Sequence, residues 1–560
     1  MHAVKTQLIP VLITFCVVVL CCSPGAALAR AETAEFSGSG PARQWQAVEF
    51  SFMAETEVAD PFDFEKAKFS ATFVGPDKTR VEVPGFWDGG RTWRIRFTPL
   101  QAGEWSCLTS FSNAADGGLH QRRGRFHADA PDTTTSTNAV RQHGGFLRVS
   151  EDRRTLTFTD GTPFFWLGDT WWAAPSAAMP FENFRRAVDT RVAQGYTVFQ
   201  AHGHRPLFPD ARGAGMGALE ATSKPDAETL RYWREVDRYY AYADEKGLVG
   251  AVGFASASHL DRHSLPELKR LWHYHIARHG AYPITFLITQ EYNMDPDERA
   301  AKIPELIALG QFIKDTDPWK RAITAHAWVH TRDRGQAWNE PWLDFIMLQA
   351  GHKRTMSGKF YRSLWPRTPA KPFLEAEANY EGFASDTLTV DAARIRDTAY
   401  VAMQCGSLGF TYGAQGLYAA VLDRAKPGPT AKWGPVKTWE EGLQLPGGAQ
   451  MQHLRACYES VEWWKLQPLP NAVEPAANLF VKAGGTETAL VYFPAKVKVA
   501  PKTRFVGLPA TSRYAAEWFD PRTGERTKVG AASTTDAKEL VLPSRPDEQD
   551  WMLILRREKE

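Results

Sequence analysis

The chain has 560 residues, of which 43% are apolar and 23% are charged. These values are ordinary for globular proteins and exclude a largely disordered chain, a collagen-like repeat and a polytopic membrane protein. Lys and Arg total 66 against 64 for Asp and Glu, so the composition gives no electrostatic basis for binding nucleic acid or an anionic membrane. The 20 tryptophans suggest flat aromatic surfaces, either in sandwich cores or against sugar rings.

Residues 1–31 have the features of a secretory signal peptide. Lys5 precedes an apolar run from Leu8 to Cys22, and small-residue cleavage sites follow this run. Because the run is short for a bilayer-spanning helix, we expect a secreted or periplasmic protein that is free of the membrane after cleavage. An uncleaved anchor and a lipoprotein site at Cys21 or Cys22 are the alternatives. Three cysteines lie beyond this segment, Cys107, Cys405 and Cys457. Because this number is small and odd, we expect no disulfide framework.

Residues 41–128 predict a small antiparallel β-sandwich. Short runs of alternating apolar and polar residues, such as Val48 to Phe52 and Trp93 to Phe97, are separated by clusters of Gly and Pro. A period of two with frequent turn signals is typical of strands that bury one face. Residues 129–140 are rich in Thr, Ser and Asp and are expected to form a linker.

Residues 141–468 alternate strand-like apolar runs with amphipathic helical stretches. Near-continuous apolar strands that alternate with helices predict a (β/α)8 TIM barrel. A doubly wound open sheet is the alternative, but it usually carries a phosphate-binding glycine fingerprint after its first strand, which Gly168 to Trp172 is not. The eight runs are 164–169, 196–202, 248–255, 284–291, 321–328, 344–350, 371–378 and 407–413.

Alternation returns in residues 469–560, for instance in Ala489 to Phe493 and in Trp551 to Leu555. This pattern predicts a second small β-sandwich. The sequence therefore predicts a multidomain protein whose central barrel is flanked by N-terminal and C-terminal antiparallel β-sandwiches.

Two glutamates end strands of the predicted barrel, where barrel enzymes place their chemistry. Glu291 ends the fourth run and Glu377 ends the seventh, and these strands approach each other across a barrel mouth. Glycoside hydrolysis needs two carboxyl groups that face each other across the sugar, one protonated and one ionised. We therefore expect Glu291 and Glu377 to be catalytic. Glu375 shares the face of Glu377 and is a competing candidate or a supporting residue.

Other polar and aromatic residues at the strand ends are expected to bind the sugar, which needs hydroxyl-binding groups and flat rings. The expected substrate-binding residues are Asp169, Trp171, Trp172, His202, His204, His326, Gln349, His352, Glu375, Tyr380 and Tyr412.

The histidines allow a metal-binding interpretation that the sequence disfavours. His202 and His204 resemble the metal-binding pair of amidohydrolase barrels, but that pair follows the first strand and is completed by an aspartate after the eighth, where this chain has Tyr412. The sequence also lacks a His-Glu-x-x-His motif, a nucleophile elbow and a phosphate-binding loop. We expect no metal and no cofactor. A predicted helix is expected to present a solvated basic face with the residues Arg270, His273, His275, Arg278 and His279.

Motifs along most of the chain resemble an architecture built around the apiosidase-like glycoside hydrolase barrel. The barrel motifs are Phe164 to Thr170, Trp342 to Phe345 with Gln349 to His352, Lys371 to Gly382 and Gly409 to Gly413. Val83 to Gly89, Arg96 to Pro99 and Gly103 to Trp105 resemble a sandwich domain of unknown function that often precedes this barrel. Trp518 to Gly524 and Asp550 to Leu553 are similar to a C-terminal domain described as collagen-binding.

The resemblance implies a retaining enzyme with Glu377 as nucleophile and the acid after the fourth strand. There the apiosidase pattern has Gly-Gly-Asp, whereas this chain ends in Gln290 and Glu291, nearer to the Asn-Glu pair of other retaining barrel hydrolases. Apiose is therefore not implied as the sugar. We expect a secreted glycoside hydrolase that acts on a plant or bacterial polysaccharide or oligosaccharide. The alternatives are a non-catalytic carbohydrate- or matrix-binding protein and a polysaccharide lyase, and the oligomeric state is left open.

Overall fold

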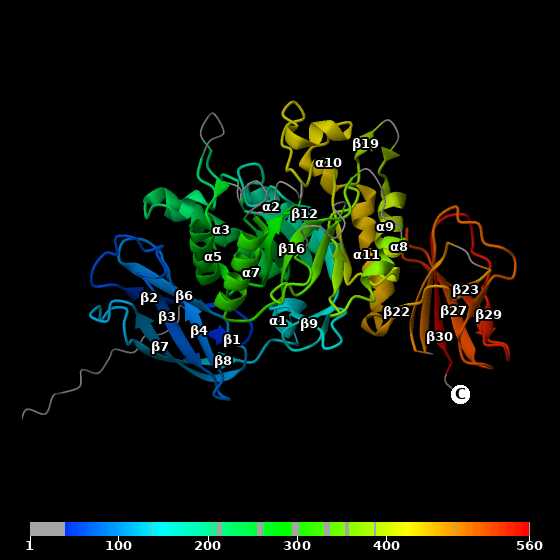
Figure 1. Ribbon diagram of the computed structural model, residues 1–560, viewed down its shortest axis with the longest axis horizontal. Helices are drawn as coiled ribbons and strands as arrows, with labels where there is room; N and C mark the ends of the chain where they lie inside the picture. Colours follow the sequence, from blue (N-terminus) through cyan, green and yellow to red (C-terminus); the bar gives the residue numbers. More distant parts are fainter. Residues whose placement is uncertain are drawn as a thin grey trace, which may run out of the picture.

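The computed structural model describes residues 40–558 except 135, 204, 210–214, 255–259, 261, 294–301, 330–336, 353–357, 386–387, 476–477 and 486. A closed barrel lies between two sandwiches, the N-terminal one in blue and the C-terminal one in orange and red (Figure 1). The expected fold class is confirmed. The predicted signal peptide lies outside the described residues.

The N-terminal sandwich consists of a five-stranded and a three-stranded sheet, in the orders β1-β8-β7-β3-β4 and β2-β6-β5. Its strands bury alternate residues, as in β2, where Val48, Phe50 and Phe52 point into the core. The strands are β1 (Ala42–Arg43), β2 (Val48–Met53), β3 (Phe69–Val74), β4 (Arg80–Pro84), β5 (Phe86–Trp87), β6 (Thr92–Phe97), β7 (Gly103–Phe111) and β8 (Arg123–Asp129).

The barrel has eight parallel strands in sequence order, and its last strand pairs with its first. This closure excludes the open doubly wound sheet. The strands are buried on both faces, which explains their near-continuous apolar runs. Each lies within one of the eight predicted runs or overlaps it: β12 (Trp166–Trp171), β13 (Val198–His202), β14 (Val249–Gly253), β15 (Ile284–Gln290), β16 (Ile323–Trp328), β17 (Ile346–Gln349), β18 (Phe373–Glu375) and β21 (Gly409–Tyr412).

Helices cover the outside of the barrel. Several begin with a side-chain cap, as in α5, where Ser264 and Glu267 form a capping box. The α-helices are α1 (Ala139–His143), α2 (Phe181–Ala193), α3 (Ala227–Lys246), α5 (Leu265–His279), α7 (Ile303–Thr316), α8 (Gly358–Leu364), α9 (Ala392–Gln404), α10 (Trp439–Leu443) and α11 (Pro446–Glu459). Short 3-10 helices are η1 (Glu220–Thr222), η4 (Gly428–Trp433) and η5 (Trp463–Lys465).

The two ends of the barrel differ. At the amino ends of the strands, a small sheet of β9 (Arg148–Val149), β10 (Leu156–Thr157) and β11 (Pro163–Phe164) precedes the first barrel strand. At the carboxyl ends lie the hairpin of β19 (Ala384–Ser385) and β20 (Leu388–Thr389), and helix α10. Figure 1 shows β9 below the barrel and β19 and α10 above it.

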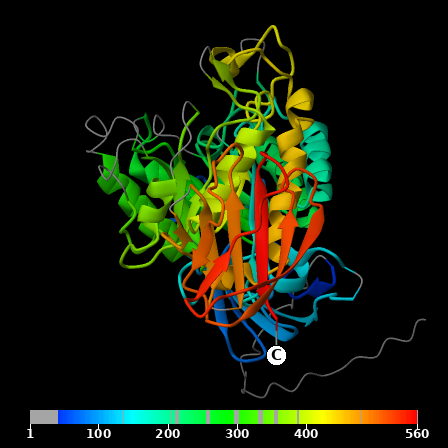
Figure 2. The ribbon, with the colours of Figure 1, turned by 90° about the vertical axis from the view of Figure 1, so that its right-hand side faces the viewer.

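The C-terminal sandwich pairs a six-stranded sheet with a three-stranded one and has its own core. It stands in front of the barrel in Figure 2, and its strands β24 and β25 contact α9. Arg396 of α9 pairs with buried Asp550, at 2.7 Å. The strands are β22 (Gln467–Pro468), β23 (Val473–Glu474), β24 (Phe480–Gly484), β25 (Thr488–Phe493), β26 (Arg504–Val506), β27 (Arg513–Phe519), β28 (Arg526–Ser533), β29 (Glu539–Val541) and β30 (Trp551–Arg557).

The N-terminal sandwich is joined to the barrel by buried charges on α3 and α5. Arg278 is 1% exposed and lies 2.7 Å from Asp237 and 3.0 Å from Asp88 of the sandwich. Arg96 of β6 also pairs with Asp237, at 2.8 Å. Although burial opposes it, Arg278 and Arg96 hold the pKa of Asp237 well below its usual range.

The expected solvated basic face on α5 is therefore wrong for three of its five residues. His275, Arg278 and His279 are buried. Asp237 of α3 and Asp88 of the sandwich cover Arg278, and Asp237 also covers His279. His275 instead faces the barrel, where it packs against Phe254 and Phe286. A single sequence gives no sign of which helix face another domain will cover.

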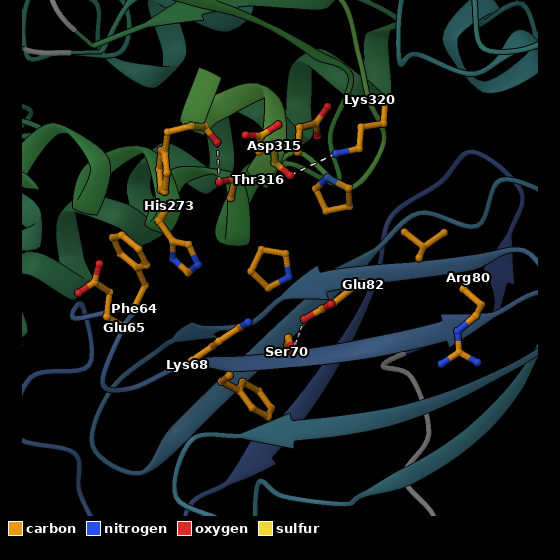
Figure 3. Close-up of a pocket in the computed structure, with 16 residues that line it drawn as sticks. Phe64, Glu65, Lys68, Ser70, Arg80, Glu82, His273, Asp315, Thr316 and Lys320 are labelled. Carbon is orange, nitrogen blue, oxygen red and sulfur yellow. Dashed lines mark hydrogen bonds between the residues drawn. The ribbon is translucent and has the colours of Figure 1, made fainter. Parts of the chain in front are cut away.

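A cleft of about 550 Å³ remains where strands β3 and β4 face α5 and α7 (Figure 3). His273 lies in it and stacks on Phe64, with ring centroids 4.5 Å apart. Ser70 donates a hydrogen bond to Glu82 on the strand side. The cleft thus combines side chains of both domains.

No helix in the described part of the chain is long and apolar enough to cross a membrane. Cys107, Cys405 and Cys457 are buried free thiols.

Candidate active site

The two predicted catalytic glutamates meet at the carboxyl ends of the barrel strands. Glu291 follows β15 and Glu377 lies two residues after β18. Between them Gln349, the last residue of β17, donates one amide nitrogen to both carboxylates, at 2.7 Å to Glu291 Oε1 and 3.1 Å to Glu377 Oε1. These two oxygens therefore cannot be further apart than the sum of the two distances, about 5.8 Å.

Glu377 is 4% exposed and is surrounded by donors. His352 Nε2 lies 3.1 Å from Oε1, and Trp172 Nε1 donates to Oε2 at 3.2 Å. His326 Nε2 is 3.5 Å from Oε2. Burial alone would raise the pKa of Glu377, but the hydrogen bond and charge of His352 outweigh it and hold this pKa below its usual value. Glu377 is therefore the carboxylate that remains ionised.

Glu291 has the opposite electrostatic environment. Its pKa is raised, first by burial and then by the negative charge of Glu377, against the hydrogen bond from Gln349. Glu291 thus keeps its proton more readily than Glu377 does. This difference is what a general acid paired with an ionised nucleophile requires.

The backbone at Glu291 is unusual. Its φ is +51°, in the left-handed region that few residues other than glycine adopt. The pairing of β15 with β16 shifts register between Leu287 and Gln290, just before it. Irregular backbone of this kind clusters at functional sites, where it aims a side chain.

Aromatic rings fix the donors around Glu377. The Trp172 ring packs edge-on against His202 and His326, with centroids 5.7 and 5.5 Å away, and its nitrogen also lies 3.0 Å from the Tyr380 hydroxyl. Gly413 lies against the Tyr380 ring, where an added Cβ would come within 2.2 Å of a ring carbon, so only glycine fits. His326 is buried, and burial lowers its pKa to about 4.

His352 faces oxygen acceptors at both ring nitrogens. Its Nδ1 is 3.0 Å from the carbonyl oxygen of Ala378 and its Nε2 is 3.1 Å from Glu377. The Trp433 ring packs edge-on against His352, at 5.2 Å.

Glu375 lies beneath Glu291 and Glu377 and is not part of this catalytic pair. It is fully buried and accepts a 2.6 Å hydrogen bond from the Tyr361 hydroxyl and 3.3 Å bonds from the backbone N–H groups of Ala350 and Glu377. Burial raises its pKa to about 7. These contacts support the two strand ends, and the prediction that Glu375 touches the sugar is not supported.

Three other predicted sugar-binding residues point to the helix layer. Asp169 is fully buried in an ion pair with Arg191 of α2, at 2.6 Å, and Tyr412 donates to Glu381 at 2.6 Å. Trp171 stacks on Phe199 in the core. Residues alternate between the inside and the outside of a barrel strand, so Asp169 and Trp171 share the outer face of β12.

His202 contacts this group of residues through the Trp172 ring. The predicted site residues that the structure brings together are Glu291, Glu377, Gln349, His352, His326, Trp172 and Tyr380. His204 lies outside the described residues. Sequence reasoning missed Tyr361 and Trp433, which come from α8 and η4 and not from a strand end. No local pattern marked either of them.

Comparison with known families decides the family. Residues 150–465 match the family described as "Apiosidase-like, catalytic domain". The chain belongs to this apiosidase-like family. Residues 41–112 of this apiosidase-like protein match a domain of unknown function, and residues 471–556 match one described as "Putative collagen-binding domain of a collagenase". The protein is a glycoside hydrolase, and the expected resemblance is confirmed in all three parts.

Solved structures of glycoside hydrolases share the fold. A "putative glycoside hydrolase" from Bacteroides vulgatus is 18% identical with a TM-score of 0.69, and the match covers 92% of this chain and 99% of that one. A family 5 glycoside hydrolase from the same organism is 20% identical with a TM-score of 0.62, over 74% of this chain and 93% of that one. No curated protein matches the apiosidase-like chain in sequence.

Proposed function

We propose that this apiosidase-like protein is an exported glycosidase that cleaves a plant or bacterial glycan with retention of configuration. Glu377 would be the nucleophile and Glu291 the general acid and base. The observation that carries the proposal is the shared hydrogen-bond donor, Gln349, which limits the two nearest carboxylate oxygens to about 5.8 Å. Retaining glycosidases hold their carboxyl groups about 5–5.5 Å apart, whereas inverting enzymes need about 6.5–9.5 Å to admit a water.

In the first step, a Glu377 oxygen attacks the anomeric carbon as the bond to the leaving oxygen breaks. That oxygen takes the proton from Glu291, which leaves a glycosyl ester on Glu377 and a carboxylate on Glu291. In the second step, Glu291 removes a proton from water, the water oxygen attacks the anomeric carbon, and Glu377 is released as a carboxylate.

The surrounding residues have matching roles. Trp172 and His352 stabilise the ionised nucleophile and direct its oxygens. Gln349 donates to both carboxyl groups and holds them in register. Export rests on the N-terminal signal pattern of Lys5 and the apolar run after it.

The test uses wild type, Glu377→Gln and Glu291→Gln on a panel of polysaccharides and aryl glycosides. Glu377→Gln should lower kcat at least about a thousandfold, and Glu291→Gln should lower it about 10²- to 10⁴-fold, with less loss when the leaving group is a good one. Glu440→Gln changes an exposed glutamate that pairs with Arg186 and is the matched control. Proton NMR of the first product formed should show the anomer of the substrate.

Full activity in either variant would remove that residue from the mechanism, and an inverted product would remove Glu377 as nucleophile. Glycan binding without release of reducing ends would favour a binding protein. Unsaturated products that absorb in the ultraviolet would favour a lyase.

A further inference from the structure

A second groove lies at the other end of the barrel from the glutamates. It has a volume of about 680 Å³ and lies where the β9–β11 segment, the chain after α8 and the start of β22 meet. Figure 1 shows β9 and β22 on the lower side of the molecule, away from α10. Its lining residues include Glu151, Asp152, Thr157, Trp365, Trp464 and Gln467.

Two of the protein's tryptophans form part of this groove. Trp365 and Trp464 are half-buried, unlike the fully buried tryptophans of the cores. The Arg154 guanidinium lies 4.2 Å from the Trp365 ring centre and also donates to the Trp365 carbonyl. Trp464 packs edge-on against Trp463, which is buried. Both rings are thus held in place before any ligand arrives, which lowers the entropy cost of binding.

Polar groups at the same groove have unused hydrogen-bonding capacity. The Glu151 carboxylate and the Gln467 amide are exposed and bond to none of the residues that the structure describes. The Trp365 and Trp464 indole N–H groups likewise donate to no residue that the structure describes. Asp152, by contrast, already accepts from Ser150 and from the backbone of Arg154. The free groups are a mixture of donors and acceptors.

We propose that this groove is a second carbohydrate-binding site, which holds a glycan chain at a distance from the catalytic glutamates. Fixed aromatic rings with a carboxylate and an amide beside them match a ligand of apolar sugar faces and hydroxyl groups. Glu151 and Asp152 are balanced by Lys465 and by Arg154 on the Trp365 ring, so the groove has no excess of positive charge that would favour a nucleic acid. The proposal rests on the proposed function only for the choice of ligand.

The experiment measures binding separately from catalysis. Glu377→Gln protein is run in native gels that contain xylan, mixed-linkage β-glucan, galactan or polygalacturonate. We expect retardation in at least one gel, and at least a tenfold weaker affinity after Trp464→Ala or Trp365→Ala. Trp464→Phe keeps a flat ring and should retain most of the affinity. Trp45→Ala removes a half-buried tryptophan of the N-terminal sandwich and is the matched control, with melting curves to verify folding.

A second measurement uses the same substitutions in active enzyme. Trp464→Ala should lower the rate on the retarding polymer and leave kcat/KM on a small aryl glycoside within twofold. Retardation that survives both groove variants, or that disappears only with Trp172→Ala at the catalytic site, overturns the proposal. So does a wild-type enzyme that cleaves a polymer and is retarded by none. Retardation by a polymer with no hydrolysis of any substrate would instead refute the proposed function and leave the groove intact.

Discussion

The division of labour between Glu291 and Glu377 comes from their neighbours, because the two side chains are chemically identical. His352 and Trp172 bring hydrogen-bond donors to Glu377. Glu291 has burial and a nearby negative charge instead. The pKa values are therefore driven apart in opposite directions, which identifies the acid and the nucleophile.

This electrostatic difference predicts the pH profile of kcat/KM. Glu377 must be ionised to attack, and its pKa is lowered, so the acidic limb should lie below the usual glutamate pKa of about 4.3. Glu291 must be protonated to assist the leaving group, and its pKa is raised. Activity should therefore fall with rising pH only above the usual glutamate pKa. His352→Gln should move the acidic limb upward, because it removes the charge that lowers the pKa of Glu377. An acidic limb that stays in place in this variant would contradict the assignment.

Glu375 gives a second prediction at the residue scale, as a positioning residue. Glu375→Ala leaves the N–H groups of Ala350 and Glu377 without their acceptor in a buried site, which costs about 1–3 kcal/mol. We expect kcat to fall about 10- to 100-fold, while KM changes less than threefold because Glu375 is fully buried. Glu375→Gln keeps an acceptor oxygen and should restore most of kcat. A change in KM alone, with kcat intact, would indicate that Glu375 contacts the sugar after all.

Strand-end positions could be predicted from the sequence better than side-chain directions could. The rule that barrel chemistry follows the strands located Glu291, Glu377 and Gln349, which the structure brings together. It also selected Asp169 and Tyr412, which face the helices. The exact last residue of a strand decides which face a side chain takes, and a sequence pattern does not fix that residue.

At the scale of elements, the barrel strands were predictable because they are buried on both faces and stand out as apolar runs. The irregular segments that complete the site were not. Trp433 comes from η4 and Tyr361 from α8, and each reaches the strand ends only through tertiary packing. The shifted register of β15, which precedes the left-handed backbone of Glu291, also leaves no pattern in the sequence.

The helix α5 shows the same limit from outside the barrel. Its period predicts a helix with a polar face, and the polar residues are indeed there. Whether that face meets water depends on the N-terminal sandwich, which covers Arg278 and leaves Arg270 a quarter exposed. The difference in burial between Arg270 and Arg278 arises only when the two domains are assembled.

At the scale of the whole molecule, the two sandwiches differ in how they join the barrel. The N-terminal sandwich shares one continuous apolar core with the barrel. The C-terminal sandwich adds Leu490, Tyr492, Phe519, Met552 and Ile554 to that core, and Tyr492 stacks on Tyr400 of α9 at 5.1 Å. It differs in that it also has a second, separate core of its own. We therefore expect the N-terminal sandwich and the barrel to unfold together.

The two arginines of α5 test this coupling as a matched pair, since each reaches an aspartate of the sandwich. Arg278→Met breaks a buried network with Asp88 and Asp237, and removing one partner of such a network costs about 3–5 kcal/mol. Arg270→Met breaks a more exposed pair with Asp60, which contributes at most about 1 kcal/mol. In scanning calorimetry, Arg278→Met should lower the Tm of the barrel transition by several degrees, and Arg270→Met should barely change it.

The shape of the transition separates coupling from simple loss of stability. If the sandwich and the barrel form one unit, the Arg278→Met barrel transition shifts as a whole and activity is lost at the same temperature as the sandwich signal. A sandwich that melts first, while the barrel keeps its activity and its Tm, would show two independent units. Equal shifts for the two variants would show that burial of Arg278 does not strengthen its contribution.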